Sequence, residues 1–281
     1  MKIGQETGSG IAALLKRGAK GFFLFRSPWR DILQFVLLAA ILIWLMSLST
    51  ATLGYNWQWS RVPRYIFAVK EGRLTAGPLI DGLLLTFKIS GVSLIFAFSL
   101  GLITALMRLS NSIVSRGLAR GYIELIRNTP LLVQLFFIYF IIGPILGMDR
   151  FFSAVLALSL FEGAYASEIF RSGIVSIHKG QWEAAYSLGL NGVDTYRFIV
   201  LPQAIRRILP PLTSQAISLI KDSALVSLIA LEDLTLQAQI VITNTFLTFE
   251  IWFVTAAIYL VITVILSTVV NYMENRFRIV T

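Results

Sequence analysis

The chain alternates between long apolar runs and shorter polar segments that carry most of its charges. A membrane-spanning helix needs about 20 mostly apolar residues. Six runs come close to this length, and they predict an all-α, polytopic membrane protein with six transmembrane helices. The runs are residues 32–48, 83–107, 131–147, 151–170, 209–231 and 251–272. In the fifth run, Pro210 and Pro211 are expected in the first helical turn, where proline is tolerated.

Composition supports the membrane interpretation and removes several kinds of chemistry. Of the 281 residues, 56% are hydrophobic and 14% are charged, whereas a soluble domain carries about 25% charged residues. The chain has no Cys, which excludes disulfides, thiolate metal sites and thiol nucleophiles. Its single histidine, His178, excludes a histidine-built metal centre or a Ser-His-Asp site. A soluble enzyme, a disordered protein and a disulfide scaffold are therefore ruled out.

The basic residues predict the orientation of the spans. They lie between the apolar runs, so the net charge of +9 does not indicate nucleic-acid binding. With a cytoplasmic N-terminus, 17 of the 24 Lys and Arg residues fall in inside segments and 5 in outside segments. Cytoplasmic loops carry such an excess, which predicts that both termini face the cytoplasm. No Lys precedes Ser or Thr, so a nucleotide-binding P-loop is excluded.

The first 76 residues divide into three predicted segments. Residues 1–31 are basic and contain Phe22, Phe23 and Trp29, a composition that suits a cytoplasmic tail lying on anionic lipid. Residues 32–48 are expected to be a membrane anchor, since the alternative of a cleaved signal peptide requires a shorter basic segment and a shorter apolar run. Residues 49–76 contain Trp57 and Trp59, and rings of this kind prefer the headgroup region. An extracytoplasmic segment at the membrane interface is expected there.

One cytoplasmic loop has an unusual pattern. Residues 182–188 favour a helix, and Gly189 with Gly192 supplies the backbone freedom that ends one. A second short helix is expected from Val193 to about Pro202. Two short helices joined by a glycine turn make a protruding element with a flat alanine face. Glu183 offers this element a charge for an Arg or Lys of a partner protein.

Within residues 180–202, a spaced set of residues resembles the EAA loop of ABC-importer permease subunits. The set is Glu183, Ala184, Ala185, Gly189, Ile199, Leu201 and Pro202. Three further segments, residues 122–134, 158–174 and 217–227, resemble the polar amino-acid branch of these permeases. The similarity covers about residues 77–276, so five helices correspond to the shared core and the first helix is an addition. Phe161 and Glu162 stand where this branch more often has a small or apolar pair.

The resemblance implies a permease subunit of a type I ATP-driven importer for a polar amino acid of the histidine, arginine, glutamine or glutamate type. A second permease chain, identical or related, would complete the pathway in the bacterial inner membrane. An extracytoplasmic binding protein would deliver the substrate, and separate ATPase subunits that use ATP and Mg would dock on the 180–202 loop. The chain itself is expected to bind no metal or cofactor and to catalyse no reaction.

Ionisable residues inside the spans are the candidate pathway or gate residues, because burying a charge in a membrane is costly. Lys221 and Asp222 are expected near the middle of the fifth span, where they serve either a zwitterionic substrate or a fixed interhelical ion pair. Glu162 and Glu168 lie in the fourth run, and Glu168 is spaced to pair with Arg171 on one helix face.

Two other charged features have mainly structural interpretations. Lys88 lies in the second run near its outer end, where it can reach the headgroups. Glu124 and Arg127 are expected to form an ion pair before Pro130.

An ion-gradient-driven secondary amino-acid carrier is the alternative function. Lys221, Asp222 and Glu162 would then couple the ion, but such a carrier has no reason to present the 180–202 loop. A membrane-embedded enzyme lacks candidate chemistry, because the chain has one His, no Cys and no paired carboxylates with an obvious base.

Overall fold

The apolar runs form long helices, most of which begin or end within a few residues of the predicted bounds. The computed structural model describes residues 32–38, 40–41, 44, 55–70 and 72–277. By its internal contacts the chain folds as two units, Met1–Trp57 and Gln58–Thr281.

The first unit is described only in part. Residues 32–38, 40–41 and 44 are helical, and the rings of Tyr55 and Trp57 meet edge to face with centroids 5.2 Å apart. The rest of the predicted 32–48 span and the whole 1–31 tail lie outside the described residues. The transmembrane helix predicted at residues 32–48 therefore stays a prediction.

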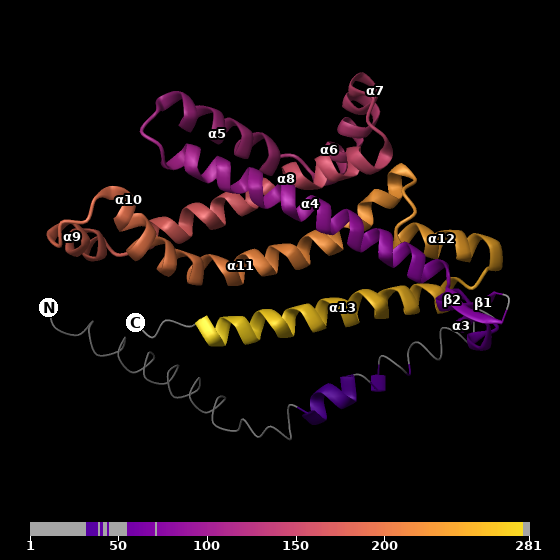
Figure 1. The fold of residues 1–281 in the computed structure, drawn as a ribbon. Coiled ribbons are helices and arrows are strands. Elements are labelled where there is room, and N and C mark those ends of the chain that lie inside the picture. The colour runs from indigo at the N-terminus through magenta and orange to yellow at the C-terminus, as the bar shows by residue number, and fades with distance from the viewer. Residues whose placement is uncertain (1–31, 39, 42–43, 45–54, 71, 278–281) are drawn as a thin grey trace, which may run out of the picture. The chain divides into compact units, whose positions relative to one another are not determined.

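The second unit is mostly helical, with one small hairpin. Its N-terminal elements are η1 (Trp59–Arg61), α3 (Pro63–Ile66), β1 (Phe67–Lys70), β2 (Arg73–Ala76), α4 (Pro78–Leu109) and α5 (Ile113–Arg127). Next come α6 (Leu131–Phe137), η2 (Ile138–Ile142), α7 (Gly143–Leu146), α8 (Arg150–Val175) and α9 (Lys179–Ser187). The remaining elements are α10 (Gly192–Asp194), η3 (Thr195–Val200), α11 (Leu201–Asp222), η4 (Ser223–Ile229), α12 (Leu234–Thr245) and α13 (Thr248–Phe277). In Figure 1, α4, α8, α11 and α13 run between an end that carries α9 and an end that carries the hairpin and α12.

Four helices of the described residues are long and apolar enough to cross a membrane. They are Pro78–Leu109, Arg150–Val175, Gly192–Ile229 and Thr248–Tyr272. The predicted run 131–147 forms the continuous helical stretch α6, η2 and α7 from Leu131 to Leu146, which is too short to pass as a span by itself. Together with Ile113–Arg127 it passes as a fifth span, broken by a bend of 104°. The bend falls at Pro130, which has no backbone N–H to continue α5.

The predicted ends of two helices near the prolines were wrong. Pro210 and Pro211 lie inside α11 rather than in its first turn, and the short helix expected to end at Pro202 continues into α11. The wide π-helical turn η3 precedes Pro202. A proline inside a helix removes a hydrogen bond but does not force a break where neighbouring segments support the helix.

The start of the second unit, from Gln58 to Ala76, adds one small hairpin to the predicted, mostly helical fold. Strands β1 and β2 pair antiparallel, with Phe67 opposite Ala76 and Lys70 opposite Arg73. The amide of Gln58 donates to the buried Glu250 carboxylate at 2.7 Å. This bond ties the start of the second unit to the first turn of α13.

The buried side chains form three clusters along the helices. One joins α4, α6, α8 and η4 around Leu135 and Leu158. A second joins α8 to α11 around Val200 and Ala204, and a third joins α4, α12 and α13 around Leu79 at the hairpin end. The second cluster positions the α9 end, which carries the first part of the candidate site.

Asp233 caps the start of α12, and its burial predicts that the stability of the folded chain depends on pH. Its carboxylate accepts from the Leu236 amide at 2.9 Å, but its other oxygen is buried without a partner among the described residues. Burial raises the pKa of Asp233 from 3.8 to about 6. The folded chain therefore holds more protons than the unfolded chain between these pH values, and the free energy of unfolding falls as pH rises through this window, by about 2–3 kcal/mol.

Asp233→Asn is expected to remove most of this slope, because Asn keeps the helix cap and has no charge. Thermal unfolding in detergent at pH 4.5, 6 and 7.5 measures it. The variant should be more stable than the native chain at pH 7.5. An equal pH slope in both proteins contradicts the assignment.

Candidate functional site

The predicted partner-binding loop is an exposed element at the α9 end, here called the α9 knuckle (residues 178–202). His178 caps α9, because its Nδ1 accepts from the Gly180 amide at 3.1 Å. The helix ends at Ser187, and Gly189, two residues later, adopts a left-handed conformation with φ +78°. Asn191 then caps α10 by accepting from the Asp194 amide at 2.9 Å. The predicted helix and its glycine end are confirmed.

The side chains of the knuckle separate into an exposed set and a buried one. Glu183 and Ala184 are exposed, whereas Ala185 is 2% exposed. The flat alanine face is therefore split, since Ala185 packs against its own chain. Of the other predicted residues, Leu201 and Pro202 are exposed and Ile199 is half-buried.

Large apolar side chains are also exposed around the knuckle turn. Leu188, Val193 and Phe198 are 80%, 76% and 58% exposed. Exposed apolar groups gathered in one place mark interaction surfaces, so the knuckle has the character of a protein-docking element.

Three contacts brace this end of the chain: one within the knuckle, one between the knuckle and α11, and one between the end of α8 and α11. The ring of Trp182 meets that of Tyr196 edge to face at 4.9 Å. Gln203 donates to the Gln181 side chain at 3.2 Å. Arg207 donates to the carbonyl and hydroxyl oxygens of Ser176 at 2.5 and 2.9 Å. A force applied to the knuckle therefore reaches α11 directly.

The second part of the candidate site is the polar face of α11. Glu162 on α8 is fully buried, and Gln215 on α11 donates a hydrogen bond to one of its carboxylate oxygens. The other oxygen of Glu162 has no partner among the described residues. Asp222 lies within interaction distance of Glu162. The three side chains form an acidic cluster between α8 and α11, in which Glu162 is fully buried.

Lys221 and Asp222 occupy the last two positions of α11, inside a span that continues through η4 to Ile229. Successive helical residues diverge by about 100°. Asp222 turns toward α8 and Glu162, whereas Lys221 is exposed and lines a cavity shared with α13. Neither residue makes an ion pair with another helix in the described part of the chain.

Glu168 belongs to an ion-pair network nearer the α9 end. It pairs with Arg171, as predicted, at 2.5 Å, and also with Arg108 on α4. The Arg108 partner was missed because it comes from a different helix, 60 residues away in the sequence.

The predicted pair between Glu124 and Arg127 was wrong. The Glu124 carboxylate accepts from Asn128 at 3.0 Å, and the Arg127 guanidinium lies over the Tyr165 ring at 5.2 Å. A cation over an aromatic face is a favourable alternative to an exposed ion pair.

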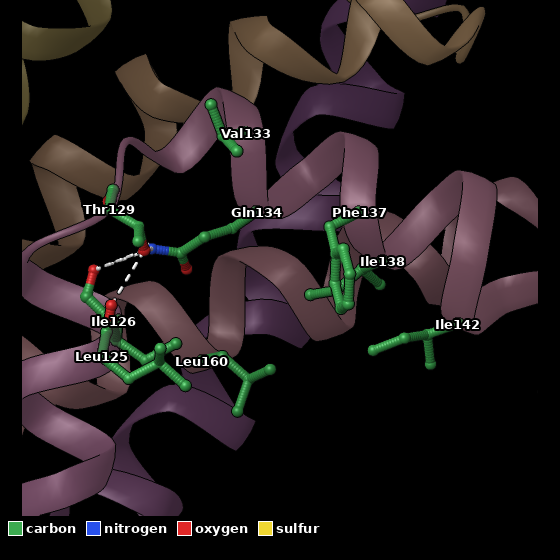
Figure 2. Close-up of a pocket in the computed structure, with 9 residues that line it drawn as sticks. All are labelled: Leu125, Ile126, Thr129, Val133, Gln134, Phe137, Ile138, Ile142 and Leu160. Carbon is green, nitrogen blue, oxygen red and sulfur yellow. Dashed lines mark hydrogen bonds between the residues drawn. The ribbon is translucent and has the colours of Figure 1, made fainter.

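A second cavity lies at the bend between α5 and α6, and its lining is apolar (Figure 2). It measures about 400 Å³ and is lined mainly by Leu125, Val133, Phe137 and Leu160. Gln134 holds the bend closed, since its amide donates to the Ile126 carbonyl at 2.7 Å and to the Thr129 hydroxyl at 2.7 Å. Without a charged group, this cavity does not suit a polar amino acid.

In the described part of the chain, no group of three or more His, Asp and Glu residues is arranged to hold a metal ion.

Sequence reasoning missed Gln215, which joins the acidic cluster. The sequence did contain a signal, because polar residues recur at helical spacing within an otherwise apolar run. These residues are Ser214, Gln215, Ser218, Lys221 and Asp222.

Comparison with known proteins assigns the family. Residues 97–279 match the model of the binding-protein-dependent transport system inner membrane component. The glutamine transport system permease protein GlnP of Escherichia coli (strain K12) is 40% identical over 72% of this chain and 93% of its own length. The L-cystine transport system permease protein TcyB of Bacillus subtilis (strain 168) is 39% identical over 83% of this chain and 97% of its own.

A solved structure agrees with these relatives. A crystal structure of an amino acid ABC transporter with histidines is 40% identical, with a TM-score of 0.67 over 71% of this chain and 94% of that one. The chain therefore belongs to the binding-protein-dependent transport system inner membrane component family, as a multi-pass permease subunit of an ABC importer.

Proposed function

We propose that this permease carries a polar amino acid inward, with both of its termini in the cytoplasm. The α9 knuckle then faces the cytoplasm, and the hairpin end faces outward, where a binding protein delivers the substrate. Relatives named for glutamine and L-cystine transport support the amino-acid class. The acidic cluster of Glu162, Gln215 and Asp222 suits the ammonium group that every amino acid carries.

The observation that carries the proposal is the α9 knuckle, on a chain without a nucleotide-binding P-loop. Its exposed Glu183, Ala184 and surrounding apolar groups suit the surface of a separate ATPase subunit. That partner would bind ATP and Mg and hydrolyse the nucleotide. A second permease chain, identical or related, completes the pathway in the inner membrane, and Lys221, Asp222, Glu162 and Glu168 line or gate it.

Reconstitution tests this function. Proteoliposomes that contain the permease, its ATPase and its binding protein should accumulate a radiolabelled amino acid only when ATP is present. The permease alone should show no uptake under a proton or sodium gradient. Gradient-driven uptake by the permease alone would instead establish a secondary carrier.

Ala184→Trp is expected to weaken ATPase docking, because Ala184 is exposed on the knuckle and has room for a larger side chain only in the absence of a partner. Co-purification of the ATPase with the permease measures the effect. Leu188→Asn, at a position that is 80% exposed, is a second variant that removes apolar docking surface.

Ala185, the buried neighbour of Ala184, provides a contrasting prediction. Ala185→Trp should instead lower the amount of folded permease, because that side chain packs within its own chain. Retention of the ATPase at the native level by both Ala184→Trp and Leu188→Asn contradicts docking at this surface.

A further inference from the structure

Helix α5 lies at membrane depth. Together with Leu131–Leu146 it passes as a membrane span, and it packs against α4 and α8. The Tyr122 hydroxyl on α5 donates to the Leu160 carbonyl on α8 at 2.6 Å. At the 1.5 Å rise of a helix, Leu160 lies about 15 Å from the first residue of α8 and about 22 Å from its last. The second half of α5 therefore lies beside the middle of a membrane-spanning helix.

The side chains of α5 divide into three faces. The face that packs against the rest of the chain is apolar and includes Ala119 and Ile123. A second apolar face is exposed and includes Leu118 and Leu125. Between the two faces, four charged residues fall within about 80° of one another, at the 100° step of a helix. These residues, here called the charged face of α5, are Arg116, Arg120, Glu124 and Arg127.

The charged face carries a net positive charge that the chain itself does not neutralise. Three arginines against one glutamate give it a net charge of +2. Arg116 is half-buried and Arg120 is exposed, and neither has an ion-pair partner among the described residues. Arg127 lies over the Tyr165 ring of α8, so the charged face continues onto α8 on its Tyr165 side.

Charges at this depth require water or protein around them. A charged side chain in hydrocarbon is costly, and charged residues of membrane spans face the bundle interior or a water-filled cavity. Arg116 lies one turn from the start of α5, where a long side chain reaches the headgroups, but Glu124 and Arg127 lie beside the middle of α8. The exposed apolar face, with Leu118 and Leu125, is the one that suits lipid. The charged face therefore suits water.

We infer that the charged face of α5 lines a water-filled part of the translocation pathway, in the half toward α9, and makes the electrostatic potential there positive. This inference rests on the proposed amino-acid transport. Basic side chains that line a pore favour anions over cations. Amino acids without a positively charged side chain should therefore pass this half of the pathway more readily than those that carry one.

The absence of cysteine from the native chain permits a direct test. Glu124→Cys places a single thiol on the charged face and keeps all three arginines, whereas Leu118→Cys and Ala119→Cys place it on the two apolar faces. The permease–ATPase complex is reconstituted in lipid nanodiscs, where both sides of the bilayer are open to reagent. It is then treated with positively and negatively charged methanethiosulfonates, and mass spectrometry of the permease chain gives the reaction rates.

The three variants should differ in rate according to their face. The reactive species is the thiolate, which forms in water, so Glu124→Cys should react at least about tenfold faster than Leu118→Cys and Ala119→Cys. Leu118 is the stringent control, because its side chain is 64% exposed within this chain. Exposure alone therefore does not predict the difference, whereas contact with lipid does.

The charge preference of the reaction measures the potential. Compared with a free thiol in solution, Glu124→Cys should favour the negatively charged reagent. Adding Arg120→Gln should lower this preference about threefold, because losing a nearby unit charge changes the energies of the two reagents in opposite directions. Arg73→Gln, at an exposed position on the hairpin, is the matched control and should leave the preference unchanged.

Four results overturn the inference. If Glu124→Cys reacts no faster than Leu118→Cys, the charged face is not in water. If Glu124→Cys instead forms a disulfide between two permease chains and excludes the reagents, the face is a buried contact between copies. If Arg120→Gln releases anionic phospholipid from the complex, the face binds headgroups. An unchanged reagent preference after Arg120→Gln contradicts the positive potential.

The uptake assay separates this inference from the proposed function. If native proteoliposomes accumulate the amino acid with ATP but Glu124→Cys does not react, only the assignment of the α5 face is wrong. If native proteoliposomes accumulate no amino acid, the proposed function itself fails, whatever the reaction rates of the cysteine variants.

Discussion

Gly189→Val is expected to reduce ATP-driven uptake about 5- to 30-fold while the permease still inserts and folds. Gly189 adopts φ +78°, a conformation that β-branched residues avoid, and forcing a non-glycine residue into it costs about 1–2 kcal/mol. A Cβ at this position meets no atom within 4 Å, so the effect comes from the backbone alone. Such a cost lowers the population of the docking-competent turn by a factor of about 5–30.

The mechanism follows from how the knuckle is held. Coupling requires that the ATPase bind the two conformations of the permease with different affinity. A rigid contact must transmit that difference to the permease helices. The edge-to-face contact of Trp182 with Tyr196 braces α9 against η3, which continues into α11, and the Gln203 side chain of α11 donates to Gln181 of α9. A tilted α9 therefore presents Glu183 and Ala184 to the ATPase at the wrong angle.

Two variants serve as controls for Gly189→Val. Gly189→Asn should retain most of the uptake, because Asn tolerates the left-handed conformation. Gly192→Ala adds a methyl group to equally open space at an ordinary φ and should be neutral. ATP-driven uptake and ATP hydrolysis are measured together in proteoliposomes. Native rates of both for Gly189→Val would falsify the coupling role of this turn.

The sequence predicted the features of this chain that depend on local pattern. Apolar run length identified the helices α4, α8 and α13, and glycine placement identified the end of α9. The pairing of Glu168 with Arg171 followed from helical spacing alone. These features are set within one or two helical turns, so no knowledge of neighbouring segments was needed.

The features that were missed depend on tertiary neighbours. Arg127 lies over Tyr165, and Arg108 reaches Glu168, because α8 passes beside α4 and α5. Periodicity cannot say which of several possible partners a charged side chain meets. The bend at Pro130 was missed for a related reason: Gln134 closes it with bonds back to Ile126 and Thr129, which a hydropathy pattern does not report.

The contact between α4 and α8 depends both on a local spacing pattern in the sequence and on the tertiary neighbour of that pattern. Ala97, Gly101 and Ala105 recur every four residues on α4 and are buried against α8. Small residues at this spacing let membrane helices approach closely. A Cβ on Gly101 would lie 2.8 Å from the Ala166 Cβ and 3.0 Å from the Gly163 carbonyl oxygen. Neither neighbour is a flexible side-chain end, so the two backbones themselves must move apart.

Gly101→Val is therefore expected to destabilise the permease by about 1–3 kcal/mol or more, the usual cost of overfilling a packed interface. The yield of monodisperse protein and its thermal unfolding in detergent measure the loss. Gly91→Val is the matched control, since Gly91 lies on the same helix, is exposed and has no atom within 4 Å of an added Cβ. Equal stability of the two variants would mean that α4 and α8 do not pack through their glycines. Because Glu162 and the acidic cluster depend on the position of α8, Gly101→Val should also lower amino-acid binding in whatever fraction remains folded.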